Sequence, residues 1–106
     1  MEIEFKDPKL LQLFEGVKVT DKKYRYPEAL LNQFRKTIRT LQSGSNINDL
    51  KSFNSLNYEK LKVNLKGKCS VRINKQYRLI LEEIVNPIDK DSIEILAIEE
   101  ISKHYE

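Results

Sequence analysis

The fold is decided by the stretch Lys68-Cys69-Ser70-Val71-Arg72-Ile73-Asn74-Lys75-Gln76-Tyr77-Arg78-Leu79-Ile80-Leu81. Apolar and polar residues alternate on both sides of the polar segment 74–76, which is typical of two antiparallel strands joined by a tight turn. A turn centred on Lys75 places Val71 opposite Leu79 on one apolar face. On the other face, Arg72 lies directly opposite Arg78. The stretch therefore predicts a hairpin with two like charges facing each other.

The segments around this hairpin predict helices first and strands afterwards. A further strand is expected at 93–98, which is apolar on both faces and so belongs inside a sheet. The expected earlier elements are a strand at 3–6, a helix started by Asp7 and Pro8 and ended by Gly16, a helix with Pro27 at its first position and Gly44 at its end, and a short turn at 47–51 capped by Ser45 or Asn46. This order predicts an α+β fold, with the helices on one face of an antiparallel sheet.

Composition predicts one small domain, 1–106, in the cytoplasm. The chain has 106 residues and one cysteine, Cys69, and we expect this thiol to be buried and structural. No apolar run approaches the length of a membrane-spanning helix, so no membrane partner is expected, and the first residues do not resemble a secretory signal. No phosphate-binding loop is present, and a single histidine is a poor metal signature, so no cofactor and no metal site are predicted.

Charge is distributed unevenly along the chain. The net charge is +3, but residues 1–80 contain 17 basic and 8 acidic residues, and residues 81–106 contain 2 and 8. The densest basic segment has no acidic residue; its charges are Lys60, Lys62, Lys66, Lys68, Arg72, Lys75 and Arg78. Such a concentration of positive charge favours a polyanionic partner, although a solvated surface is the plain alternative.

The opposed arginines are the strongest functional signal from the residues themselves. Like charges directly across a strand pair repel each other. Pairing with Glu82, Glu83 or Glu94 would be a structural explanation. Phosphate binding would be a functional one, because guanidinium groups bind phosphate oxygens in a bidentate manner.

A second candidate lies at the C-terminus, where His104, the only histidine, is followed by Tyr105. An imidazole and a phenol together can move protons during phosphodiester cleavage. A surface histidine near a chain end is the alternative.

The segment 65–80 resembles the core of the HigB-like plasmid-maintenance killer toxins of the RelE/ParE superfamily. The most specific part is Ser-Val-Arg-Ile-Asn-Lys-Gln-Tyr-Arg, residues 70–78. The preceding strand and helix pair, the second led by proline, fit the same family. The resemblance covers nearly the whole chain and is strongest over 65–81.

This resemblance implies a RelE-like domain in which two N-terminal helices pack on a curved antiparallel sheet. Many such toxins cleave messenger RNA in the ribosomal A site, and a helix-turn-helix antitoxin, HigA-like here, commonly holds them inactive. The family's sheet arginines match Arg72 and Arg78. The implied function is a ribosome-dependent endoribonuclease in which Lys60, Lys62, Lys66, Lys68 and Lys75 contact RNA.

One departure from the family concerns its catalytic C-terminus. Many HigB-like toxins end the last strand in Asp-Tyr-His, whereas residues 93–99 contain no Tyr-His pair and His104-Tyr105 follows later in reversed order. These two residues are therefore candidates for acid–base catalysis from a short extension. A ParE-like inhibitor of DNA gyrase and a nucleic-acid-binding module that does not cleave remain as alternatives.

Overall fold

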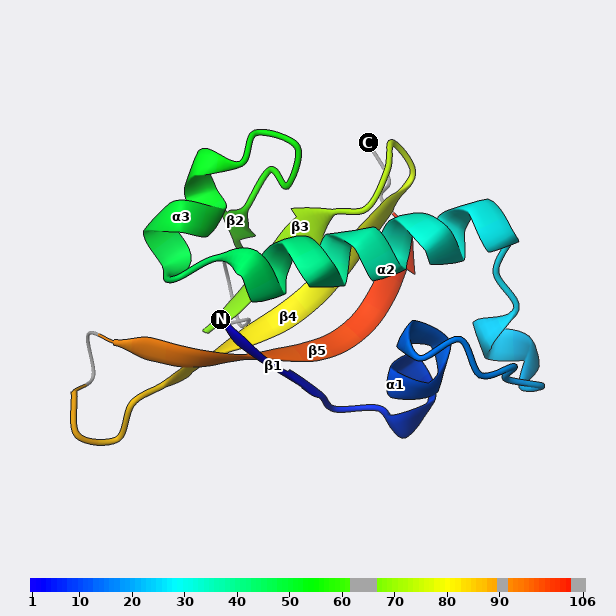
Figure 1. Ribbon diagram of the computed structural model, residues 1–106, viewed down its shortest axis with the longest axis horizontal. Helices are drawn as coiled ribbons and strands as arrows, with labels where there is room; N and C mark the ends of the chain where they lie inside the picture. Colours follow the sequence, from blue (N-terminus) through cyan, green and yellow to red (C-terminus); the bar gives the residue numbers. More distant parts are fainter. Residues whose placement is uncertain (62–66, 90–91, 104–106) are drawn as a thin grey trace.

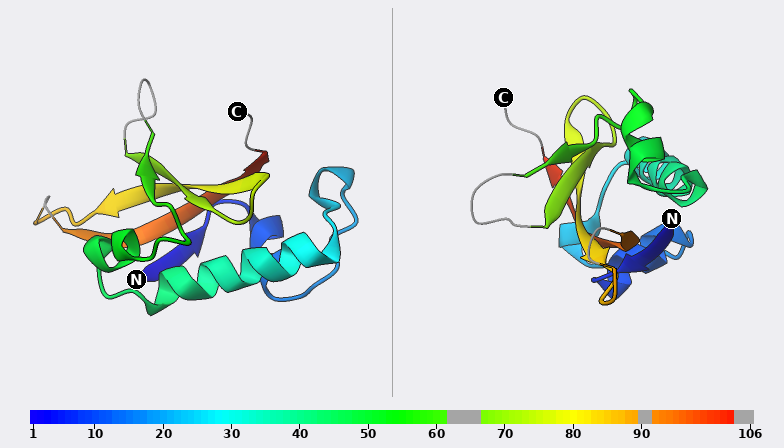
Figure 2. Two further views of the ribbon diagram at one scale, coloured as in Figure 1. Left: turned by 90° about the horizontal axis from the view of Figure 1, so that it is seen from above. Right: turned by 90° about the vertical axis from the view of Figure 1, so that its left-hand side faces the viewer.

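The computed structural model, which describes residues 1–61, 67–89 and 92–103, places helices on one side of a five-stranded sheet (Figure 1). The elements follow in the order β1 (Glu2–Phe5), α1 (Pro8–Phe14), the 3-10 turn η1 (Lys22–Tyr24), α2 (Glu28–Ser43), α3 (Ile47–Ser52), β2 (Glu59–Lys60), β3 (Lys68–Arg72), β4 (Tyr77–Val85) and β5 (Ile93–Lys103). In Figure 2, α2 runs along one face of the sheet, and no described helix covers the opposite face. We call that opposite side the open face.

The hairpin between β3 and β4 has the predicted register. Val71 pairs with Leu79 and Arg72 pairs with Arg78. In the turn, the Asn74 side chain accepts hydrogen bonds from the backbone N–H groups of Gln76 and Tyr77, both at 2.8 Å. The two arginines therefore lie opposite each other on the open face.

The sheet has the strand order β1-β5-β4-β3-β2 and is antiparallel from β2 to β5, which confirms the antiparallel pairing predicted for β3, β4 and β5. β5 is an interior strand and includes the polar residues up to Lys103, beyond the expected 93–98. β1 differs from the expected antiparallel arrangement, because it joins β5 in parallel. No short turn connects these two strands, so their relative direction could not be inferred from a turn.

The helix ends follow the capping residues closely. Asp7 caps α1 by accepting a hydrogen bond from the Lys9 backbone N–H at 2.9 Å, and Pro8 is the first helical residue. Asn46, one of the two residues expected to cap a turn, caps α3. Pro27 was predicted inside α2 but lies one residue before it, because its ψ of 144° is extended.

The core lies between α2 and the sheet. Phe34, Ile38 and Leu41 on α2 are fully buried and belong to one cluster with Val71 and Leu79 of the hairpin. This burial removes the apolar face of the hairpin from water and leaves the arginines on the other side. None of the helices in the described part of the chain has both the length and the apolar character that a membrane span requires.

Candidate nucleic-acid interface

Two arginines from neighbouring strands form the centre of the candidate site. Arg72 ends β3 and is exposed, whereas the side chain of Arg78, at the start of β4, is only 14% exposed. Within the described residues, the Arg72 guanidinium has no ion-pair or hydrogen-bond partner. The pair therefore combines a free cation with one that the protein holds in place.

Arg78 is held by residues that precede the hairpin. Its Nη1 lies 3.3 Å from Oε2 of Glu59, and its Nη2 donates to the backbone oxygen of Asn57 at 3.4 Å. The same loop contacts β3, because the backbone N–H of Arg72 donates to the backbone oxygen of Leu56 at 2.6 Å. Asn57 has a φ of 45°, which asparagine tolerates better than most residues.

The carboxylates offered as the structural explanation of the arginine pair have other partners, so that alternative does not hold. Glu82 pairs with Lys6 at 3.3 Å, Glu83 accepts a hydrogen bond from the Tyr58 hydroxyl at 2.6 Å, and Glu94 accepts one from Asn86. The actual carboxylate partner of Arg78 is Glu59, which comes from β2. A two-residue strand gives too short a pattern to be recognised in a sequence.

The predicted RNA-contacting lysines fall into different environments. Lys60 and Lys75 are exposed, as a solvent-accessible contact requires. Lys62 and Lys66 lie outside the described residues, as do His104 and Tyr105. The predicted acid–base role of His104 and Tyr105 therefore stays a prediction.

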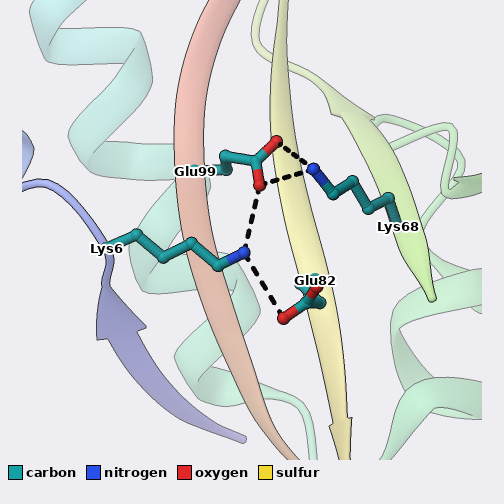
Figure 3. Close-up of polar contacts among 4 residues, drawn as sticks. All are labelled: Lys6, Lys68, Glu82 and Glu99. Atoms are coloured by element: carbon teal, nitrogen blue, oxygen red, sulfur yellow. Dashed lines mark hydrogen bonds and ion pairs between the residues drawn. The ribbon is translucent and has the colours of Figure 1, made fainter. Parts of the chain in front are cut away.

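Lys68 is engaged in a cluster of four charges on the open face (Figure 3). Its Nζ lies 2.8 Å from Oε1 of Glu99, and Lys6 contacts the same carboxylate at 3.0 Å and Glu82 at 3.3 Å. The hydrogen bond from Lys68 holds the pKa of Glu99 below its ordinary value, and the bond to Glu99 raises the pKa of Lys6. This cluster links β1, β5, β4 and β3 across the sheet.

Ser70 is a polar residue of the site that sequence reasoning did not select. It lies between Lys68 and Arg72 on β3 and has 0% exposure, and its Oγ has no hydrogen-bond partner within the described residues. Alternation alone places Ser70 on the outer face, where burial was not expected. In the register of β2 and β3, Ser70 is the partner of Glu59.

Two other features, Cys69 and a large hollow, lie away from the arginine pair. Cys69 is fully buried, as predicted, and burial raises its pKa to about 11, which is unfavourable for a thiolate nucleophile. A hollow of about 650 Å³ lies beside α2 and is lined in part by Leu13, Tyr24 and Leu31. Neither Arg72 nor Arg78 lines it. A smaller hollow of about 210 Å³ borders Arg72 and includes Lys36 of α2. In the described part of the chain, no group of three or more His, Cys, Asp or Glu residues could hold a metal ion.

Similarity to solved structures shows a shared fold. YafQ from Escherichia coli has a TM-score of 0.58 at 14% identity, covering 96% of this chain and 91% of that one. A YoeB/ParE toxin from Agrobacterium tumefaciens has a TM-score of 0.54 at 16% identity, covering 99% and 100%. A YoeB-YefM complex from Staphylococcus aureus has a TM-score of 0.54 at 21% identity, covering 99% and 98%.

Sequence similarity is more specific and shows the family. Toxin HigB-1 of Vibrio cholerae is 39% identical over 83 residues, which are 77% of this chain and 83% of that protein. Residues 3–92 match the family described as the RelE-like toxin of type II toxin-antitoxin system HigB. An antitoxin partner follows from membership of such a system. The chain belongs to the HigB-like toxins, the RelE-like toxins of type II toxin–antitoxin systems.

Proposed function

We propose that this toxin is a ribosome-dependent endoribonuclease that cleaves messenger RNA in the cytoplasm and so inhibits translation. The observation that carries the proposal is the pairing of Arg72 with Arg78 on the open face, with the Arg72 guanidinium left without a partner in the described structure. Two cations at this spacing lower the stability of the strand pair. A phosphate bound between them removes the repulsion and accepts hydrogen bonds from both guanidinium forks.

The proposed reaction is transesterification at phosphorus. The ribose 2′-oxygen forms a bond to phosphorus while the bond from phosphorus to the 5′-oxygen breaks, which leaves a 2′,3′-cyclic phosphate. A general base takes the proton of the 2′-hydroxyl, and a general acid gives a proton to the departing 5′-oxygen. Arg72 and Arg78 stabilise the charge that builds up on the phosphate oxygens.

We assign the acid–base roles to His104 and Tyr105. The described part of β5 ends at Lys103, which pairs with Tyr77, and the preceding residue Ser102 pairs with Arg78. The last described residues of the chain therefore pair with the strand that carries Arg78. An imidazole and a phenol can take and give the protons that this reaction moves.

Binding of the RNA backbone is assigned to the lysines that accompany the arginines along the chain. Lys60 in β2 and Lys75 in the hairpin turn are exposed, and Lys62, Lys66 and Lys68 complete the set. Lysine contacts to phosphate add affinity that is independent of sequence and sensitive to salt. We further propose that the domain spans 1–106 and that its antitoxin is a HigA-like helix-turn-helix protein.

Removal of either arginine tests the proposal in cells. Arg78→Ala and Arg72→Ala should each lower messenger RNA cleavage by roughly 10²–10³-fold and relieve growth arrest, as expected for loss of an electrostatic stabiliser. Arg39→Ala, at an exposed position on α2, is the matched control and should stay toxic. Circular dichroism checks that each protein is folded. A folded Arg78→Ala protein that still cleaves and still arrests growth would remove Arg78 from the site.

Growth arrest without any cut messenger RNA would identify a different target. The alternatives are a protein target such as DNA gyrase, as in the ParE branch, and an RNA-binding module that blocks translation without cleavage. Supercoiling of plasmid DNA from the arrested cells separates them, because only inhibition of gyrase relaxes it.

A further inference from the structure

Arg78 already holds an anionic group of the protein itself. The Glu59 carboxylate lies 3.3 Å from Nη1 of Arg78, on the same open face as the unpaired Arg72. A carboxylate and a phosphate present similar oxygen pairs to a guanidinium group. The Glu59 carboxylate therefore occupies the position at Arg78 that an oxygen of the RNA phosphate would take.

The two partners differ in how firmly they are held. The Arg78 side chain is 14% exposed and also donates to the backbone oxygen of Asn57, whereas the Glu59 side chain is 50% exposed. Glu59 belongs to the two-residue strand β2 at the edge of the sheet. Among the described residues, Glu59 has no second ion pair or side-chain hydrogen bond to lose when it turns into solvent.

The strand beneath this ion pair offers an unused hydrogen-bond donor. Glu59 is in register with Ser70 of β3, and Arg78 reaches it from β4 on the other side of β3. The pair therefore spans Ser70, which is fully buried and whose Oγ has no hydrogen-bond partner within the described residues. This hydroxyl is thus an unused donor on β3, in register with the carboxylate that a phosphate would replace.

We propose that Glu59 is an internal competitor of the RNA phosphate at Arg78, displaced when RNA binds. This inference rests on the function proposed above and concerns the regulation of the same site. It implies that the free toxin has a lower affinity for RNA than it would have if Arg78 had no carboxylate partner. Any contact that holds the Glu59 side chain away from Arg78 would therefore raise the affinity of the toxin for RNA.

The measurement is the affinity of the free protein for a fluorescent single-stranded RNA with 2′-methoxy groups, which cannot be cleaved by the 2′-oxygen. Glu59→Gln keeps an oxygen that accepts from Arg78 but removes the charge. It should bind this RNA about three- to tenfold more tightly than the original protein, because a partly exposed ion pair is weak. Fluorescence anisotropy at fixed salt gives the dissociation constants.

Glu100→Gln is the matched control, because Glu100 is also a carboxylate of the open face and pairs with Ile80, two residues along β4 from Arg78. It should change the affinity less than twofold. In an Arg78→Ala background, Glu59→Gln should have no effect, because the competition has been removed. A gain that persists in that background would come from general charge repulsion and would overturn the proposal.

The outcomes separate this proposal from the proposed function. Equal affinity of the original and Glu59→Gln proteins overturns the role of Glu59 and leaves the endoribonuclease standing. Tighter binding by Glu59→Gln, in a toxin that cuts no messenger RNA, supports the role of Glu59 and removes the nuclease. Failure of both proteins to bind the RNA overturns the competition.

Discussion

Asn74 fixes the turn that brings the two arginines together. Its Oδ1 accepts hydrogen bonds from two backbone N–H groups of the turn, and its Nδ2 donates to Oε1 of Gln33 in α2 at 2.9 Å. Asparagine is favoured in such turns because its side chain can replace a backbone acceptor. Here the same side chain also ties the hairpin to the helix layer.

Replacement of Asn74 should therefore cost stability. Asn74→Ala removes three hydrogen bonds and should lower the free energy of unfolding by about 1–2 kcal/mol, measured by urea denaturation. Lys75→Ala, at the exposed neighbouring position, should change it by less than about 0.5 kcal/mol. Equal stability of the two variants would show that the turn forms without the Asn74 side chain.

At the scale of single residues, sequence reasoning succeeded where a regular pattern repeats. Alternation around Lys75 predicted the register, and so the opposition of Arg72 and Arg78, correctly. It did not find Glu59, because its contact with Arg78 joins residues that are distant in the chain. It also missed the burial of Ser70, which depends on what covers the outer face rather than on strand alternation.

At the scale of elements, β5 is the strand that connects the sheet. It pairs with β1 in parallel and β4 antiparallel, and the register shift between Ile80 and Leu81 leaves Glu99 as an extra residue in a bulge. This bulge lets Glu99 contact Lys6 and Lys68, which lie on opposite sides of β5 (Figure 3). One carboxylate thus links the first strand to the catalytic hairpin of the proposed function.

Loss of this carboxylate should weaken the sheet. Glu99→Gln should lower the free energy of unfolding by about 1 kcal/mol at pH 7, whereas Glu100→Gln, an exposed position on the same strand, should have little effect. Because the folded-state pKa of Glu99 lies below its ordinary value of 4.5, the ionised form stabilises the fold above that value. The difference between the original protein and Glu99→Gln should shrink as the pH falls below about 4.5 and through the folded-state pKa.

Urea denaturation at a series of pH values measures this difference. A gap that stays constant down to acid pH would mean that the charge of Glu99 contributes nothing to stability.

The parallel pairing of β1 with β5 could not be predicted from the sequence, because the strands are separated by almost the whole chain. The helices and the hairpin, whose signals are local, were predicted with boundaries within a few residues.

At the scale of the whole molecule, the basic body and the acidic C-terminal part of the chain neutralise each other. Glu82 and Glu99 belong to the acidic part and pair with Lys6 and Lys68 of the basic part. Folding therefore pairs some of the acidic residues of the C-terminal part with basic residues of the preceding part. Arg72 keeps an unpaired charge within the described residues, so its guanidinium group is available to bind an anion.

The position of the core explains why the open face is free for binding. Phe34 of α2 is fully buried against the other face of the sheet, so the helix stabilises the hairpin without covering the arginines. Phe34→Ala should lower the free energy of unfolding by about 3–5 kcal/mol through the lost contacts and the cavity left behind. Phe53→Ala, at a side chain that is 40% exposed, should cost much less. Similar thermal midpoints for the two variants would contradict this account of the core.

The most direct test of the central claim is an in vitro translation reaction with the purified toxin, in which the ends of the messenger RNA are mapped. The proposed toxin should make cuts that depend on ribosomes and leave a 2′,3′-cyclic phosphate at the upstream fragment, and these cuts should be lost with Arg72→Ala and Arg78→Ala. Intact messenger RNA in reactions that contain folded toxin and translating ribosomes would contradict the proposed activity.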